Sequence, residues 1–190
     1  MDIRILLMTF ENIDIARRDI PKIRGYIANK YPEMDQLHNH AKEGFIYRYP
    51  MIQYKQINGK PGIIAIGEGI GIINEIENKL ESFVLKDKKI DIYEKGIKLY
   101  TSKYGIASNL VKYIFISPWM CLNQINYEKY KECDENQGVD LLKRILIGNI
   151  LSMSKGFSYN VKEQINAYIN LKPCEINFKN NKMIGFKGEF

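Results

Sequence analysis

The sequence predicts an α+β protein that is built from two domains in tandem. Residues 1–100 follow the order β-α-β-β-α-β, and the pattern resets near "TSKYGIAS", residues 101–108, to begin again as β-α-β-β. Hydrophobic residues make up 45% of the 190 residues, which is enough to bury a core. The element order is that of ferredoxin-like (RRM-like) domains. We therefore expect one such domain over 1–105, carrying a histidine pair, and a second over 106–190 that is incomplete at its C-terminal end.

The first three elements follow from apolar periodicity. Residues 3–11, "IRILLMTFE", are typical of a buried strand. Residues 19–31, "DIPKIRGYIANKY", predict a helix with Pro21 near its start, because Ile23, Ile27 and Tyr31 form one apolar stripe. Two strands over 46–57 and 61–66 are joined by "NGK", which is a hairpin signal.

The rest of the first half follows from glycine and from alternation. In "GEGIG", residues 67–71, the glycines suggest a phosphate loop, but the motif has neither the P-loop lysine nor the dinucleotide spacing. A tight turn that enters a helix over 67–83 is the better interpretation. Residues 83–100 alternate apolar and basic side chains and predict strand, as a further hairpin.

The second half contains one strong helix among weaker strand signals. Residues 138–156 carry an apolar stripe that ends before Gly156. Residues 111–125 are typical of a strand, and Trp119 within them is expected in the core. Three short strands are expected after the helix, over 165–171, 174–179 and 182–190.

Composition favours an anionic partner and a reducing compartment. The formal net charge is +6, and only six of the 28 basic residues are arginines, so phosphate contacts would be mostly lysine point charges. The thirteen tyrosines could stack on bases, or they could simply build strands together with isoleucine and lysine. The three cysteines form no CxxC pair. With neither a signal peptide nor a long apolar run at the start or later, we expect a cytoplasmic protein without a membrane partner.

All the imidazoles of the chain lie in one tripeptide, "HNH", as His38 and His40. If residues 37–41 are extended, the two side chains share a face with Cβ atoms about 6–7 Å apart, which could bracket a phosphodiester. One imidazole could then take the proton of a ribose 2′-hydroxyl, and the other could protonate the departing 5′-oxygen. Nearby side chains could supply a donor or a positive charge: Lys30, Lys42, Tyr47 and Arg48.

Two other interpretations of the histidines stay open. Both could be loop residues with ordinary hydrogen bonds. They could also be two zinc ligands, with Asp35 or Glu43 completing the site.

Residues 22–69 resemble the N-terminal region of Cas6, the CRISPR repeat-processing endoribonucleases, within the Cas6b-type branch. The resemblance rests on "IRGYI", "HNH", "YRYPMIQYK" and "IAIGEG", and it continues more weakly through "ILIGNILSMSKG" to "MIGFKGEF". It implies two ferredoxin-like domains and metal-independent cleavage of CRISPR repeat RNA without a cofactor. The implied products carry a 5′-hydroxyl and a 2′,3′-cyclic phosphate.

The resemblance also implies roles for individual residues. His38 and His40 would be the acid/base pair, with Tyr47 and Lys30 as supporting catalytic residues. The residues expected to bind RNA are Lys42, Arg48, Tyr49 and Lys55. A homodimer and a CRISPR effector complex are further partners consistent with this interpretation.

The sequence departs from the family in one respect. The glycine-rich motif GxGKxxxxGFG, which contacts RNA in Cas6 proteins, does not occur in these 190 residues. A non-catalytic RNA-binding module of the same fold is therefore the alternative function, and a metal-dependent phosphodiesterase is a third.

Overall fold

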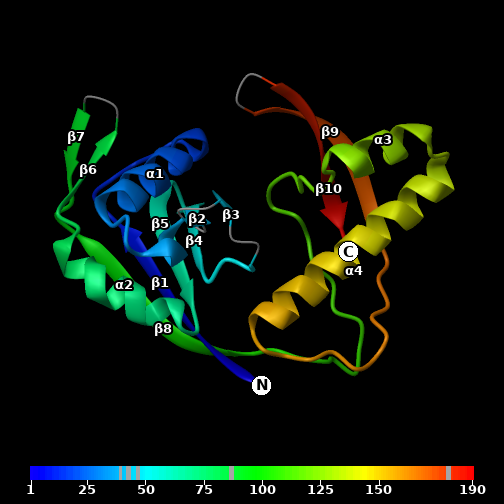
Figure 1. Cartoon of the computed structure of the whole chain (residues 1–190), viewed down its shortest axis with the longest axis horizontal. Helices are drawn as coiled ribbons and strands as arrows, with labels where there is room; N and C mark the ends of the chain where they lie inside the picture. Colours follow the sequence, from blue (N-terminus) through cyan, green and yellow to red (C-terminus); the bar gives the residue numbers. More distant parts are fainter. Residues whose placement is uncertain (39, 42–43, 46–47, 86–87, 179–180) are drawn as a thin grey trace. The chain divides into compact units, whose positions relative to one another are not determined.

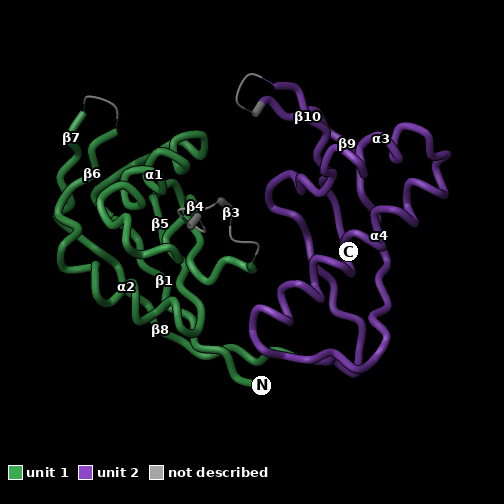
Figure 2. The backbone as a smooth tube through the Cα atoms, viewed as in Figure 1, with its two compact units in different colours: residues 1–105 green, residues 106–190 purple. Residues whose placement is uncertain are grey.

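The computed structural model describes residues 1–38, 40–41, 44–45, 48–85, 88–178 and 181–190 (Figure 1). The chain divides into two compact units, residues 1–105 and residues 106–190 (Figure 2). Within the described residues, no helix is both long enough and apolar enough to cross a membrane.

Unit 1 is a four-stranded antiparallel sheet with two helices. The sheet order is β4-β5-β1-β8. Strands β1 and β5, the first and third of the four along the chain, are central, and β4 and β8 form the edges. This is the ferredoxin-like arrangement, and it confirms the predicted fold. The elements in chain order are β1 (Asp2–Phe10), α1 (Ile20–Lys30), β4 (Ile52–Ile57), β5 (Lys60–Ile66), α2 (Gly69–Ile76) and β8 (Lys95–Lys103).

Short elements are inserted into this frame. The 3-10 helices are η1 (Arg17–Asp19), η2 (Asp35–Leu37) and η3 (Glu77–Lys79). The small strands pair as hairpins, β2 (His40–Ala41) with β3 (Gly44–Phe45) and β6 (Ser82–Leu85) with β7 (Lys88–Asp91). The second pair, followed by β8, confirms the hairpin that alternation predicted over 83–100.

Alternation on β1 and the stripe on α1 explain the core of unit 1. From Leu6 to Phe10 every second residue of β1 is buried, and Met8 and Phe10 have no exposed surface. Ile23 and Ile27 of α1 belong to the same core cluster. Phe83 of β6 joins it edge-to-face on Phe10, with ring centroids 4.8 Å apart.

The predicted hairpin after the histidine segment is confirmed, with a shorter first strand. Asn58 and Gly59 form its two-residue turn at φ 50° and 84°, left-handed values that suit Asn and Gly. β4 begins at Ile52 and not at residue 46, because Pro50 cannot donate to a ladder. Residues 46–47 lie outside the described part of the chain.

"GEGIG" is a tight strand-to-helix turn, as predicted. Gly67 has φ 56° and its N–H donates to the carbonyl oxygen of Arg4. A Cβ at Gly69 would lie 2.9 Å from the carbonyl oxygen of Met51, so the backbone approach there requires glycine.

Unit 2 consists of two helices and a β-hairpin. Its elements are α3 (Gln124–Glu132), α4 (Glu135–Gly156), β9 (Asn170–Phe178) and β10 (Asn181–Glu189). The α4 helix confirms the strongest helix prediction, and a capping box of Asp134 and Gln137 begins it. Bridges from Ile114 to Glu189 and from Trp119 to Phe186 place the segment 113–119 beside β10. In space, β10 therefore lies between the segment 113–119 and β9. The first three strands of a ferredoxin-like sheet have the same arrangement, with the third between the first and the second.

Three predictions for unit 2 are wrong in detail. The segment 111–125 is not one strand, because Pro118 interrupts its pairing and α3 begins at Gln124. Of the three strands predicted after α4, the first, over 165–171, does not form over 165–169. Its last two residues and the second predicted strand belong to one continuous strand, β9. Pro173 lies within β9, which among the described strands pairs on one side only, with β10, and proline is tolerated in such an edge strand. Trp119 is half-buried, stacked on Phe115 at 5.1 Å, and not fully in the core.

Candidate functional site

The histidine segment joins a 3-10 helix to a short strand. His38 is the residue that ends η2, with φ −139° and ψ −7°, and it is half-buried. The backbone of His40 begins β2 and pairs with Phe45. The condition that residues 37–41 are extended throughout is therefore not met, because Leu37 still belongs to the helical turn. Simple strand alternation does not decide where the two imidazoles point, and the described part of His40 is its backbone.

Three contacts fix the backbone of Leu37 and His38. The side chain of Leu37 is 1% exposed within the core of unit 1. The Tyr54 hydroxyl on β4 donates to the carbonyl oxygen of Leu37 at 3.2 Å. Nη2 of Arg24 on α1 donates to the carbonyl oxygen of His38 at 2.6 Å. A helix and a strand of the main fold thus hold the same two-residue stretch.

Burial keeps Tyr54 a neutral donor. Burial raises the pKa of the Tyr54 hydroxyl well above its ordinary value, and the positive charge of Arg24 acts in the opposite direction. The Leu37 carbonyl therefore keeps its donor throughout the pH range in which imidazole titrates.

Arg48 and Asp35 form an ion pair across the same segment. Nη2 of Arg48 lies 3.3 Å from Oδ1 of Asp35, with side chains 33% and 47% exposed. A pair this exposed adds little stability, about 0–1 kcal/mol, but it directs the guanidinium toward η2. Asp35 was one candidate for a third zinc ligand, and Glu43, the other, lies outside the described residues. Among the residues that are described, no three His, Cys, Asp or Glu side chains gather as a metal site.

The other predicted residues are placed as follows. Nζ of Lys30 donates to the carbonyl oxygen of Lys79 in η3 at 2.8 Å, and lies 5.7 Å from the Tyr31 ring centroid. The hydroxyl of half-buried Tyr49 accepts from Nε2 of Gln53 at 3.1 Å, and burial raises the pKa of that hydroxyl. Lys55 is exposed on β4. Tyr47 and Lys42 lie outside the described residues.

Arg24 and Tyr54 are the residues that sequence reasoning missed. They lie 14 and 17 residues from the carbonyls they bind, one in a helix and one in a strand. No local motif links them to the histidines. Only the return of the chain from α1 to β4 brings both donors to one stretch of backbone.

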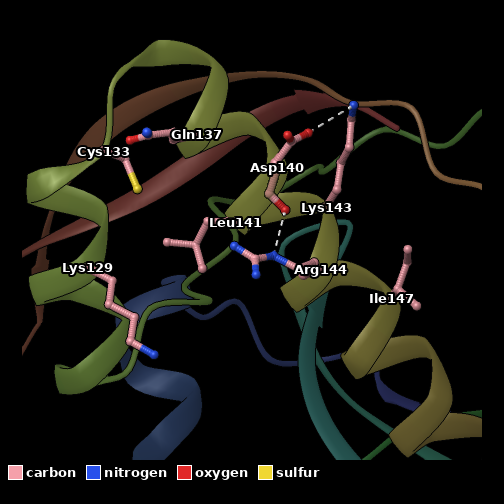
Figure 3. A pocket seen from close by; sticks show the side chains of 8 residues that line it. All are labelled: Lys129, Cys133, Gln137, Asp140, Leu141, Lys143, Arg144 and Ile147. Atoms are coloured by element: carbon pink, nitrogen blue, oxygen red, sulfur yellow. Dashed lines mark hydrogen bonds and ion pairs between the residues drawn. The ribbon is translucent and has the colours of Figure 1, made fainter.

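Unit 2 has an open pocket of about 640 Å³ between α3 and α4 (Figure 3). Three cations line it, Lys129 from α3 and Lys143 and Arg144 from α4, and the apolar side chains of Leu141 and Ile147 line it as well. Lys143 lies 3.7 Å from the Asp140 carboxylate, and Nε of Arg144 donates to the Asp140 carbonyl oxygen at 3.4 Å. The pocket is therefore cationic, with part of its charge committed to Asp140.

Family models match both halves of the chain. Residues 1–103 match the Cas6b N-terminal domain, and residues 105–190 match the Cas6b C-terminal domain. A curated relative, the uncharacterized protein MJ0978 of Methanocaldococcus jannaschii, is 41% identical over 119 residues. That alignment covers 62% of this chain and 81% of the relative.

Two solved structures match the chain over its whole length. A crystal structure of Cas6b shares 40% identity at a TM-score of 0.92, and 88% of that protein is covered. A crystal structure of the CRISPR RNA processing endoribonuclease Cas6b shares 38% identity at a TM-score of 0.77, with 86% covered. Because one family accounts for both units by sequence and by fold, the chain belongs to the Cas6b family.

Proposed function

We propose that this protein is an endoribonuclease that cleaves CRISPR repeat RNA, the precursor of crRNA. One observation carries the proposal: a solved protein described as a CRISPR RNA processing endoribonuclease matches this chain along its full length at 38% identity. The histidine segment supports it, because α1 and β4 both donate to the backbone of Leu37 and His38, and His40 follows two residues later in the sequence.

The proposed reaction is internal transesterification, which needs neither water nor a metal ion. One imidazole of His38 and His40 takes the proton of the 2′-hydroxyl, and the 2′-oxygen attacks phosphorus. The bond from phosphorus to the 5′-oxygen breaks, and the other imidazole protonates that oxygen. The products are a 2′,3′-cyclic phosphate and a 5′-hydroxyl. Tyr47 and Lys30 would stabilise the charge that develops on the phosphorane.

The same surface is proposed to hold the substrate. Four residues that follow the histidines in the sequence are proposed to bind RNA: Lys42, Arg48, Tyr49 and, on β4, Lys55. Arg48 and Lys55 offer positive charge to phosphates, and Tyr49 offers a ring face to a base. A second copy of the chain and a CRISPR effector complex are the further partners that we expect.

Cleavage of repeat RNA in excess chelator tests the proposal. We expect cleavage at one position of the repeat, with a cyclic phosphate on the upstream product and a 5′-hydroxyl on the downstream one. Binding without cleavage would favour the RNA-binding module, and activity that chelator abolishes would favour the metal-dependent phosphodiesterase. As the matched control, a repeat with a single 2′-deoxyribose at the cleavage site should bind equally well and stay intact.

A further inference from the structure

The backbone at His38 follows a single short 3-10 turn. In η2 the N–H of Leu37 donates to the carbonyl oxygen of Met34 at 3.0 Å, and the N–H of His38 donates to that of Asp35 at 3.2 Å. Short 3-10 turns are weak on their own. Buried Leu37 anchors the chain up to its own Cα. Beyond that point, the direction of the Leu37 carbonyl sets the ψ angle of Leu37, and the direction of the His38 carbonyl sets the ψ angle of His38.

Two donors from the main fold fix the directions of these two carbonyl groups. The Tyr54 hydroxyl holds the carbonyl of Leu37, and the Arg24 guanidinium holds the carbonyl of His38. The Arg24 bond is short, 2.6 Å, as expected of a charge-assisted hydrogen bond. We propose that Arg24 and Tyr54 are positioning residues for RNA cleavage: they hold the backbone of His38 in place without touching the reacting atoms. This inference rests on the proposed function for its catalytic consequence, but the holding itself can be measured without RNA.

Both donors suit a permanent clamp. Guanidinium stays charged at every pH at which a protein is folded. Tyr54 stays protonated because burial raises the pKa of its hydroxyl. Proton transfer is sensitive to such support, because a displacement of about 1 Å can cost about 10²-fold in rate.

Single substitutions separate positioning from binding. In single-turnover cleavage at saturating protein, we expect Arg24→Gln to slow the reaction about 10- to 100-fold, and Tyr54→Phe about 3- to 10-fold. For Tyr54→Phe, the Kd for uncleavable 2′-deoxy repeat RNA should change by less than about 2-fold. For Arg24→Gln, that Kd should change no more than it does for a control variant that loses the same charge elsewhere. That control is Arg18→Gln, an exposed arginine of η1, which removes the same charge from unit 1. Tyr168→Phe, an exposed tyrosine of unit 2, is the control for the hydroxyl.

Two further measurements address the clamp as a unit. The double variant Arg24→Gln with Tyr54→Phe should be slowed by less than the product of the single effects, because both donors hold one segment. Guanidinium ion at millimolar concentration should restore part of the rate of Arg24→Ala, since Arg24 lies on an exposed face, and should not restore His38→Ala.

Hydrogen exchange provides the readout that does not depend on activity. Without RNA, the backbone amides of residues 35–41 should exchange faster in Arg24→Gln and Tyr54→Phe than in the wild type, while those of β5 stay unchanged. Unchanged exchange together with an unchanged rate would overturn the inference. A rate loss matched by a loss of RNA affinity beyond that of Arg18→Gln would overturn it too, because Arg24 would then be an RNA contact. If the wild-type protein leaves repeat RNA uncut, the proposed function fails, and the exchange measurement still decides the clamp.

Discussion

Single residues decide the chemistry that the histidine segment can perform. His38 ends a helical turn and the backbone of His40 begins a strand, so the two residues belong to different backbone structures although one residue separates them. The proposed acid and base must hold opposite protonation states when the reaction begins. The carbonyl of His38 is bound by Arg24, whereas the backbone of His40 pairs with Phe45.

The two histidines should therefore fail in different ways. We expect His38→Ala and His40→Ala each to slow cleavage by about 10²-fold or more, and the double variant to be slower still. A substrate whose 5′-bridging oxygen is replaced by sulfur needs no acid, because thiolate is a good leaving group. It should restore the rate of the variant that lost the acid, and leave the variant that lost the base slow. Equal rates in the double variant and the wild type would remove the histidines from the mechanism.

Tyr54 also predicts a loss of stability at alkaline pH. Its folded-state pKa lies above the ordinary value of 10.0, so folding favours the protonated form. That stability is fully present below pH about 10 and declines above it, by about 1.4 kcal/mol per pH unit for one proton. Urea unfolding of the wild type and of Tyr54→Phe at pH 9 to 11 should show a shallower decline in the variant. Parallel curves for the two proteins would show that Tyr54 ionises as easily folded as unfolded.

At the level of elements, local signals predicted the frame of unit 1, and tertiary contacts decided the rest. The turn residues Asn58 and Gly59 signal the hairpin, and the apolar stripe of Ile23 and Ile27 signals the helix. Both signals lie within a few residues of sequence, so these two elements could be predicted. Helix α3 could not, because a strand-like pattern runs into it and only the cap at Asn123 marks its start. The clamp on residues 37–38 was equally hidden, because its donors come from elements distant in sequence.

The turn between β4 and β5 should be sensitive to the loss of its glycine. Gly59 has φ 84°, so Gly59→Ala should lower the free energy of unfolding by about 1–2 kcal/mol through backbone strain alone. Gly71→Ala is the matched control: it lies in α2 with nothing within 4 Å of an added Cβ, and should raise stability by about 0.5–1 kcal/mol. Chemical denaturation of both variants gives the comparison. A neutral Gly59→Ala would mean that the turn relaxes to another type.

For the whole molecule, the net charge of +6 predicts binding that weakens with salt. Each phosphate neutralised by lysine or arginine releases counterions, so the logarithm of affinity should fall linearly with the logarithm of salt concentration. Removing one phosphate contact by Lys55→Gln should reduce the slope by about 0.7–0.9, whereas Lys162→Gln, an exposed lysine in unit 2, serves as the control. A flat salt dependence in the wild type would mean that stacking and hydrogen bonds to bases dominate instead.

The two units differ in how much core each contains, and this predicts how fragments behave. The core cluster of buried hydrophobic side chains lies within unit 1. In the described part of unit 2, the buried hydrophobic side chains are Leu141, Leu142, Leu146 and Phe186. Mutual backbone bonds between Met1 and Tyr104 complete the last strand pairing of unit 1 just before residue 105.

A fragment of residues 1–105 should therefore fold alone, with a single cooperative thermal transition, since it keeps its whole sheet and core. A fragment of residues 1–94 is the matched comparison, because it lacks β8 and leaves one edge of β1 unpaired. We expect it to melt at a lower temperature, because nine residue pairs between β1 and β8 are lost, or to aggregate through the exposed edge. Residues 106–190 alone should unfold with little cooperativity, since few side chains are buried there. If residues 1–105 fail to fold while the full chain melts cooperatively, unit 1 depends on the second unit, and the two form one folding unit.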